Sequence, residues 1–161
     1  MKTASRALIG IVMIVGLIGL TSSSQAQTDD EPTSAEGYFR LGNDYFKGNL
    51  TDKAVEAYER SVELKPDYKE AWYNLGVAYA KQRKYKREIQ AYQKAVELDP
   101  RYAKALYNLA IAYEDADRPE DALDAYRRVI QVTPEAVDAH INMGILHARL
   151  GNTKAAVEAY R

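Results

Sequence analysis

The stretch AWYNLGVAY at residues 71–79 returns 34 residues later as ALYNLAIAY at residues 105–113. A fixed period of this length indicates one supersecondary unit that is repeated along the chain. Such a unit buries its apolar face only against its neighbours, so the repeat decides the fold.

The period holds over residues 35–161 without an insertion. Positions 34 residues apart form columns that hold similar side chains: Leu41, Leu75, Leu109 and Met143 in one, Tyr58, Tyr92, Tyr126 and Tyr160 in another, and Pro66, Pro100 and Pro134 at the close of each complete unit. Three full units are therefore predicted at residues 35–68, 69–102 and 103–136, with a partial fourth at 137–161.

Each unit is predicted to be a pair of helices. In the first half, Trp72, Leu75 and Tyr79 recur at spacings of three and four, which is typical of one buried helical stripe. The second half repeats this spacing up to Pro100, which ends a helix because it lacks a backbone donor and disfavours helical geometry in the residue before it. The predicted fold class is therefore all-α, built from helix hairpins.

The pattern resembles the tetratricopeptide repeat. That family's order of an aromatic residue, Leu-Gly, Tyr, a second aromatic residue and a closing Pro is matched by Trp72, Leu75, Gly76, Tyr79, Tyr92 and Pro100. The resemblance implies a right-handed superhelical solenoid of antiparallel hairpins. It also implies that the first helices line a concave groove that binds peptides or proteins.

On this resemblance, the residues between the stripe positions face the groove. The predicted binding residues are Phe39, Asn43, Tyr73, Asn74, Val77, Lys104, Tyr107, Asn108 and Ile111. Asparagine amides both donate and accept, so a ladder of them can hold a peptide backbone while the aromatic rings supply apolar contact. The alternative is a purely structural role, because asparagine is common at this place in the family.

Some family members bind acidic C-terminal tails through a clamp of basic residues and asparagines. Asn43, Asn74 and Lys104 match that clamp, but Phe39 stands where a lysine is expected and Asn108 where an arginine is expected. One lysine alone would hold a carboxylate weakly. We therefore expect an extended peptide with apolar side chains as the ligand.

Glu88 departs from its column, which otherwise holds Ala54, Ala122 and Ala156. A carboxylate is costly to bury where two helices pack closely. The favoured interpretation is a tolerated misfit whose long side chain reaches an Arg or Lys at the rim of the hairpin. A functional role is the alternative.

Residues 1–26 have the pattern of a signal peptide. Lys2 and Arg6 precede an apolar run over residues 7–20, and Ser24 and Ala26 are small residues suited to cleavage after Ala26. An uncleaved membrane anchor is the alternative, but 14 residues fall short of the roughly 20 that span a bilayer. We therefore expect export, most plausibly to a bacterial periplasm, with no stable membrane insertion afterwards.

Residues 27–34 are acidic and polar, and are predicted to form a disordered linker. Thr33 and Glu36 have capping-box spacing, which predicts the first helical turn. Loss of residues 1–26 leaves 20 basic residues against 23 acidic ones. This balance gives no reason to expect a nucleic acid or an anionic membrane as partner.

The sequence carries no signature of a catalytic or metal site. There are no cysteines, and the only histidines, His140 and His147, occupy the columns of Trp72 and Tyr79, where packing explains them. Phosphate-binding glycine loops and serine elbows are also missing from the sequence. We expect no enzyme activity and no cofactor.

The sequence thus predicts a non-catalytic scaffold that binds a peptide or a partner protein. Two alternatives stay open. The amphipathic helix that ends at Tyr160 has no polar capping element, so the chain could be a structural module that self-associates through it. It could also be an accessory fragment of a larger cell-envelope complex, or a truncated piece of a longer repeat array.

Overall fold

The computed structural model describes residues 32–161. Every regular element in that range is an α-helix: α1 (Ala35–Lys47), α2 (Thr51–Leu64), α3 (Lys69–Lys81), α4 (Tyr85–Leu98), α5 (Ala103–Asp115), α6 (Pro119–Val132), α7 (Val137–Arg149) and α8 (Thr153–Ala159). The all-α prediction is confirmed. The predicted signal peptide and residues 27–31 of the predicted linker lie outside the described residues.

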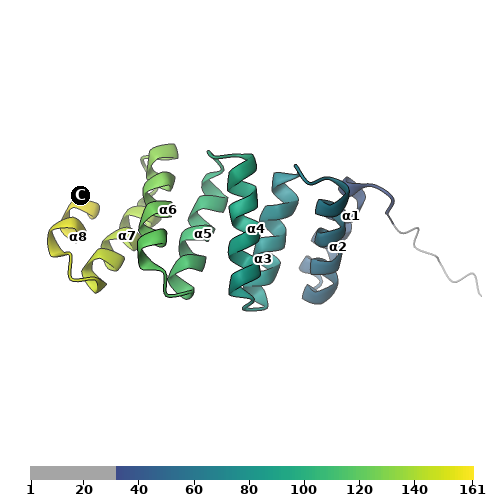
Figure 1. Ribbon diagram of the computed structural model, residues 1–161, viewed down its shortest axis with the longest axis horizontal. Helices are drawn as coiled ribbons and strands as arrows, with labels where there is room; N and C mark the ends of the chain where they lie inside the picture. Colours follow the sequence, from purple (N-terminus) through teal and green to yellow (C-terminus); the bar gives the residue numbers. More distant parts are fainter. Residues whose placement is uncertain (1–31) are drawn as a thin grey trace, which may run out of the picture. The chain divides into compact units, whose positions relative to one another are not determined.

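The helices pair as hairpins, α1 with α2, α3 with α4, α5 with α6 and α7 with α8, and each hairpin packs on the next. Figure 1 shows the helices side by side in sequence order, with the turns inside the hairpins along one edge and the connections between hairpins along the other. Residues 32–161 therefore form a solenoid of helix hairpins. This arrangement places the first helices of successive hairpins next to one another.

Each hairpin is held by a tyrosine ring that lies against a small residue. Tyr58, Tyr92 and Tyr126 are at most 2% exposed. A Cβ atom on Gly76 would lie 2.5 Å from Cε1 of Tyr92, which is far inside van der Waals contact. The glycine therefore lets the ring of α4 lie directly on the backbone of α3.

The turn inside each hairpin uses one left-handed residue, always in the same column. These residues are Asn49 (φ 62°), Arg83 (φ 55°), Asp117 (φ 55°) and Gly151 (φ 77°). Glycine adopts this conformation freely, and Asn and Asp tolerate it better than other residues that carry a Cβ atom. Arg83 is therefore the least favourable of the four choices.

The apolar interior divides into two clusters. One contains Val55, Tyr58 and Leu75 from α2 and α3, and the other contains Leu106 and further side chains from α4 to α7. Trp72 packs against both clusters. Its side chain therefore links two parts of the interior that are otherwise separate.

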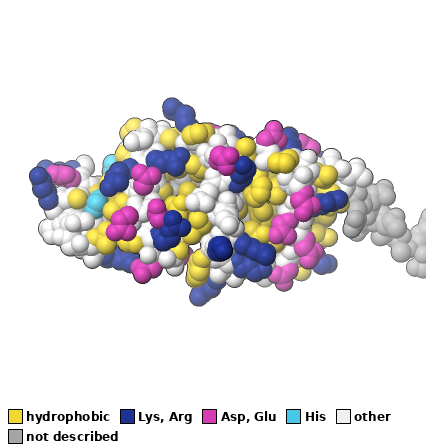
Figure 2. Space-filling model, viewed as in Figure 1, with side chains coloured by type: hydrophobic (Ala, Val, Ile, Leu, Met, Phe, Trp, Pro, Cys, Tyr) yellow, Lys and Arg dark blue, Asp and Glu magenta, His cyan; other side chains and the backbone are white. Residues whose placement is uncertain are grey.

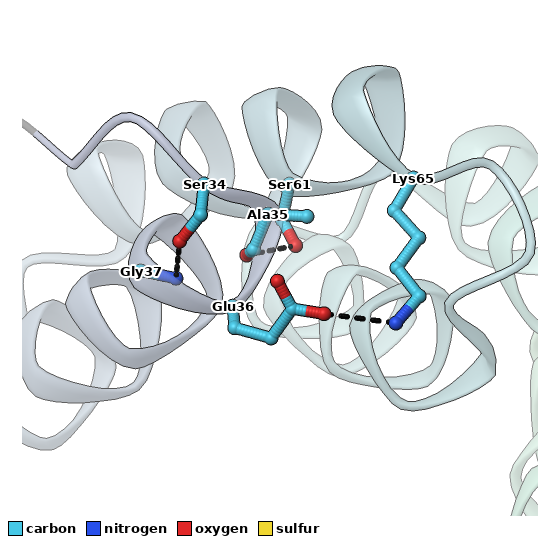
Figure 3. Close-up of polar contacts among 6 residues, drawn as sticks. All are labelled: Ser34, Ala35, Glu36, Gly37, Ser61 and Lys65. Carbon is cyan, nitrogen blue, oxygen red and sulfur yellow. Dashed lines mark hydrogen bonds and ion pairs between the residues drawn. The ribbon is translucent and has the colours of Figure 1, made fainter.

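The start of α1 differs from the prediction by one residue. Oγ of Ser34 accepts a hydrogen bond from the backbone N–H of Gly37 at 3.1 Å, so Ser34 is the N-cap and not Thr33. The expected capping box does not form, because the Glu36 carboxylate accepts from Nζ of Lys65 at 2.8 Å instead (Figure 3). Serine and threonine oxygens can both cap a helix. Here the helix begins at Ala35, so Ser34 is the residue whose oxygen accepts from a free amide of the first turn.

A second serine ties this helix start to α2. Oγ of Ser61 is buried and donates to the carbonyl oxygen of Ala35 at 2.8 Å (Figure 3). A buried hydroxyl needs such a partner. The first hairpin is thus joined at its open end as well as at its turn.

Glu88 is buried in α4, with 4% of its surface exposed. No ion pair joins it to any side chain in residues 32–161, so the expected contact with an Arg or Lys is wrong. Burial, together with the smaller effect of the negative charge of Asp115, raises the pKa of Glu88 to about 7. The side chain is therefore buried without a cationic partner among the described residues.

The surface mixes charges of both signs with apolar side chains over the face drawn in Figure 2. Within residues 32–161, no helix combines the length and the apolar character that crossing a membrane requires.

Candidate functional site

The predicted groove residues lie on the first helices of three successive hairpins. Most of them are half-buried, while Lys104 is exposed: Phe39 and Asn43 on α1, Tyr73, Asn74 and Val77 on α3, and Lys104, Tyr107, Asn108 and Ile111 on α5. Half-buried polar and aromatic side chains on adjacent helices form a surface that is ordered but still accessible.

An asparagine links each of the last two hairpins to the one before it. The side-chain N–H of Asn108 donates to the hydroxyls of Tyr73 (3.3 Å) and Tyr92 (3.4 Å). Asn142 repeats this pattern one hairpin further on, donating to Tyr107 (3.0 Å) and Tyr126 (3.2 Å). Each asparagine thus bonds to one tyrosine on each helix of the preceding hairpin, and its amide hydrogens are engaged inside the protein.

The first link of this series is built differently. Asn74 occupies the same column, but Phe39 has no hydroxyl to accept its hydrogen bond. Asn43 replaces it, and its Oδ1 accepts from Asn74 at 2.7 Å and from the hydroxyl of Tyr58 at 2.8 Å. Asn43 therefore connects the first two hairpins and is not free to grip a ligand through this oxygen.

Burial favours the neutral form of the linking tyrosines on the second helices of the hairpins. It raises the pKa of Tyr58 to about 12, and it raises the pKa values of Tyr92 and Tyr126 well above the ordinary range. Tyr126 also donates to the Glu114 carboxylate at 2.7 Å. These hydroxyls therefore stay protonated near neutral pH, and the network keeps its hydrogen-bond directions.

Aromatic rings fill the groove side of the first two hairpins. The ring of Phe39 lies 5.0 Å from that of Tyr68, and the ring of Tyr73 lies 5.3 Å from that of Tyr102, measured between centroids. The third residue of this column is Ala136, so Tyr107 has no such neighbour. The third hairpin thus leaves unfilled the space that a tyrosine occupies in the first two.

A cavity of about 450 Å³ lies at this place. Of the predicted residues, Tyr73, Lys104, Tyr107 and Asn108 line it. The others, Phe39, Asn43, Asn74, Val77 and Ile111, lie elsewhere along the first helices and do not line this cavity.

The sequence prediction missed the other side of the cavity. Its walls also include Val129 and Thr133 from the end of α6 and beyond, and Ala136 and Val137 at the start of the fourth hairpin. The signal that could have found it is the column Tyr68, Tyr102, Ala136, in which an aromatic residue is replaced by a small one.

The electrostatics of the cavity are mixed. Lys104 lines it together with the carboxylates of Glu135 and Asp138. One cation beside two anions does not make a carboxylate-binding fork, which uses several convergent cationic donors.

His140 takes the packing role of Trp72, as its column predicts. The ring nitrogen Nε2 of His140 lies 2.9 Å from the carbonyl oxygen of Pro134, and Nε1 of Trp72 donates to that of Pro66 at 2.8 Å. In the part of the chain that the structure describes, no group of three or more His, Cys, Asp or Glu side chains could hold a metal ion.

The hairpins, their period and the shared face of their first helices define the class of helical-repeat proteins. A family model described as tetratricopeptide repeat matches residues 39–103 and 107–161. The chain therefore belongs to the tetratricopeptide repeat family.

Several solved structures are similar to this chain. A crystal structure of MamA is 28% identical and covers 82% of this chain and 77% of that one, with a TM-score of 0.78. MamA from Desulfovibrio magneticus RS-1 is 24% identical over 79% of this chain and 72% of that one, with a TM-score of 0.72. The first tetratricopeptide repeat domain of Spaghetti (RPAP3), bound to the HSP90 peptide SRMEEVD, is 24% identical over 73% of this chain and 94% of that one, with a TM-score of 0.70. A search of curated proteins finds no match to this chain.

Proposed function

We propose that this protein is a non-catalytic interaction scaffold that binds an extended segment of a partner protein along its first helices. The observation that carries the proposal is the cavity beside Tyr107, which opens on the face where the predicted groove residues lie. The structural relative from RPAP3 holds a peptide, which supports the same class of ligand here.

The proposed binding mechanism rests on groups that the internal network leaves over. Asn74, Asn108 and Asn142 use their amide groups as donors inside the protein, and within residues 32–161 their Oδ1 atoms have no hydrogen-bond partner. A peptide N–H can donate to these oxygens. Since hydrogen bonds within the protein already fix these side chains, the protein loses little conformational freedom when the peptide binds.

The ligand preference follows from the rings and charges of the same face. Tyr73 and Tyr107 are half-buried and offer apolar surface, while Lys104 is the cation that lines the cavity. Apolar side chains in the peptide therefore contribute more than acidic ones. This distinguishes the proposed ligand from the acidic tails that some family members bind.

The test replaces Asn74 and Asn108 together by alanine in the full chain. A partner is first captured by crosslinking the protein in its own cell envelope, and its affinity is then measured by titration calorimetry. We expect the affinity to fall at least about tenfold, as for the loss of buried hydrogen bonds, while the circular dichroism stays helical. Asn152→Ala, at an exposed position in the turn before α8, is the matched control.

Unchanged affinity in the double variant, with the control also unchanged, would contradict a binding role for the asparagines.

We further propose that the chain is exported. The proposal rests on the sequence of residues 1–26, with its basic start, apolar run and small residues before the expected cleavage after Ala26. Mass spectrometry of the protein from an envelope fraction should then find Gln27 as its first residue. A full-length N-terminus in that fraction would favour the uncleaved anchor instead.

Self-association through the last hairpin is a second candidate function. Tyr160 is 53% exposed, whereas its counterparts Tyr58, Tyr92 and Tyr126 are buried, and Val157 beside it is also exposed. Exposed apolar surface of this kind is typical of an interface. Light scattering should then give a mass that rises with concentration and loses this dependence in Tyr160→Glu.

A further inference from the structure

The third hairpin lacks one aromatic ring that the first two possess. Tyr68 and Tyr102 each lie beside the aromatic residue of the preceding first helix, at ring distances of 5.0 and 5.3 Å. Ala136 holds the same column and leaves Tyr107 without this neighbour. The cavity of about 450 Å³ includes both Tyr107 and Ala136 in its wall.

The backbone at this column is the same in all three hairpins. Tyr68 has φ −85° and ψ 84°, Tyr102 has φ −75° and ψ 80°, and Ala136 has φ −70° and ψ 80°. The third hairpin has therefore kept the geometry that holds a tyrosine and has lost only its side chain. What fits there is known from the first two hairpins.

The surroundings of the filled sites show which chemistry they favour. Nζ of Lys65 lies 4.8 Å from the ring centroid of Tyr68, and Nζ of Lys69 lies 5.3 Å from that of Tyr102. Lys104 lines the open cavity. A cation near an aromatic face is attractive. The wall of the open cavity holds an aromatic neighbour, Tyr107, and a lysine, Lys104, although Lys104 belongs to another column than Lys65 and Lys69.

The chain's own N-terminal segment cannot supply the missing ring. Residues 1–31 contain no Phe, Tyr or Trp. Aromatic side chains pair favourably with one another at centroid distances of roughly 4.5–7 Å. The occupant that matches this cavity is therefore an aromatic side chain from another protein.

We propose that the cavity between Tyr107 and Ala136 is an anchor pocket for a Tyr or Phe side chain of an extended partner segment. The ring takes the place that Tyr68 and Tyr102 fill in the first two hairpins. This inference rests on the proposed function and gives it a side-chain specificity, because the pocket selects one aromatic residue within the bound segment.

The first experiment uses N-acetyl-tyrosinamide as the probe, with N-acetyl-glutaminamide as the control. Titration of the isotope-labelled full chain should shift the amide signals of Tyr107, Ala136 and Val137 with the aromatic compound only. Shifts that are absent, or equal for both compounds, would overturn the anchor pocket.

The second experiment fills the pocket from within. Ala136→Tyr restores the side chain that this backbone holds in the other hairpins, so the variant should fold, with a melting temperature no lower than that of the parent protein. Ala136→Ser leaves the pocket open and is the matched control. The probes are peptides selected from a random phage-displayed library against the parent chain.

We expect the selected peptides to share an aromatic residue. Their affinity should fall at least about tenfold in Ala136→Tyr and on replacing that residue by alanine, as for the loss of one buried aromatic anchor. It should stay unchanged in Ala136→Ser. Peptides that respond to the Asn74 and Asn108 double variant but not to Ala136→Tyr would overturn the anchor pocket and leave the groove standing. Peptides whose affinity is unchanged in both variants would overturn both proposals. If Ala136→Tyr does not fold, the titration with N-acetyl-tyrosinamide decides.

Discussion

The second hairpin (α3 and α4) and the third hairpin (α5 and α6) share one architecture, and four of the columns in which they differ affect stability or ligand space. The differences, second hairpin first, are Gly76 against Ala110, Arg83 against Asp117, Glu88 against Ala122, and Tyr102 against Ala136. The second hairpin carries a buried carboxyl group and a less favourable turn residue, but its groove side is filled. The third has an apolar interior at these places and an open cavity. The residues that affect stability and the residue that leaves space for a ligand are therefore at different positions of the repeated unit.

The largest expected effect comes from making the second hairpin resemble the third at Glu88. Its folded-state pKa, about 7, lies above the ordinary value of 4.5, so the carboxyl costs stability once the unfolded chain ionises. The cost is absent below about pH 4, grows as the pH rises and is complete above about pH 7. Glu88→Ala should therefore raise the free energy of unfolding by about 3 kcal/mol at pH 8, at about 1.4 kcal/mol per pKa unit, and by much less at pH 4.

Urea titrations at both pH values measure this difference. Glu56→Ala, at an exposed position on α2, is the control and should change little. A lower stability of Glu88→Ala at pH 8 would contradict the view of Glu88 as a tolerated misfit.

Substitutions of the small residues that lie against the tyrosine rings, Gly76 and Ala110, should change the free energy of unfolding less. Gly76→Ala places a methyl group against the ring of Tyr92, which must shift, and this strain exceeds the gain of about 1 kcal/mol in helix propensity. Ala110→Gly in the third hairpin loses that propensity and a buried methyl group. In thermal melts, Gly76→Ala should lower the free energy of unfolding by about 1 kcal/mol, and Ala110→Gly by about 2 kcal/mol. If Gly76→Ala instead stabilised the protein, the ring of Tyr92 would be able to shift and accommodate the added methyl group, as Tyr126 accommodates that of Ala110.

The smallest effect is expected in the turns. Arg83→Gly removes the strain of a left-handed arginine but increases the freedom of the unfolded chain, so the net gain is about 0.5 kcal/mol. Asp117→Gly should gain less, because aspartate tolerates this conformation. Equal melting temperatures for the two variants would show that the turns do not distinguish these residues.

Most of the fold was predictable because the repeat supplies several copies of each position. The columns of Leu75, Tyr92 and Pro100 predict the helices and their ends through spacing alone, and the structure has helices with these ends. Errors arose where one residue competes with its neighbour or acts alone. Ser34 replaced Thr33 as the cap, and Glu88 remained without the partner that its long side chain was expected to reach.

The candidate site was predictable only in part. The family resemblance predicted which face of the first helices would be accessible. Four residues that it selected line the cavity: Tyr73, Lys104, Tyr107 and Asn108. The hydrogen bonds of the asparagines were not predictable, because they depend on which tyrosine of the preceding hairpin lies within reach. The cavity itself arises because Ala136 has no ring. The spacing of residues predicts which side chains share a face, but it does not show the space that a small side chain leaves open.

The position of Trp72 between the two apolar clusters makes the chain's own fluorescence a probe of cooperativity. It is the only tryptophan, and it packs against both clusters. Repeat arrays are coupled through nearest-neighbour interfaces, so the indole lies at the boundary where the two halves of the interior either separate or melt together. Its emission therefore follows this boundary during unfolding without any added label.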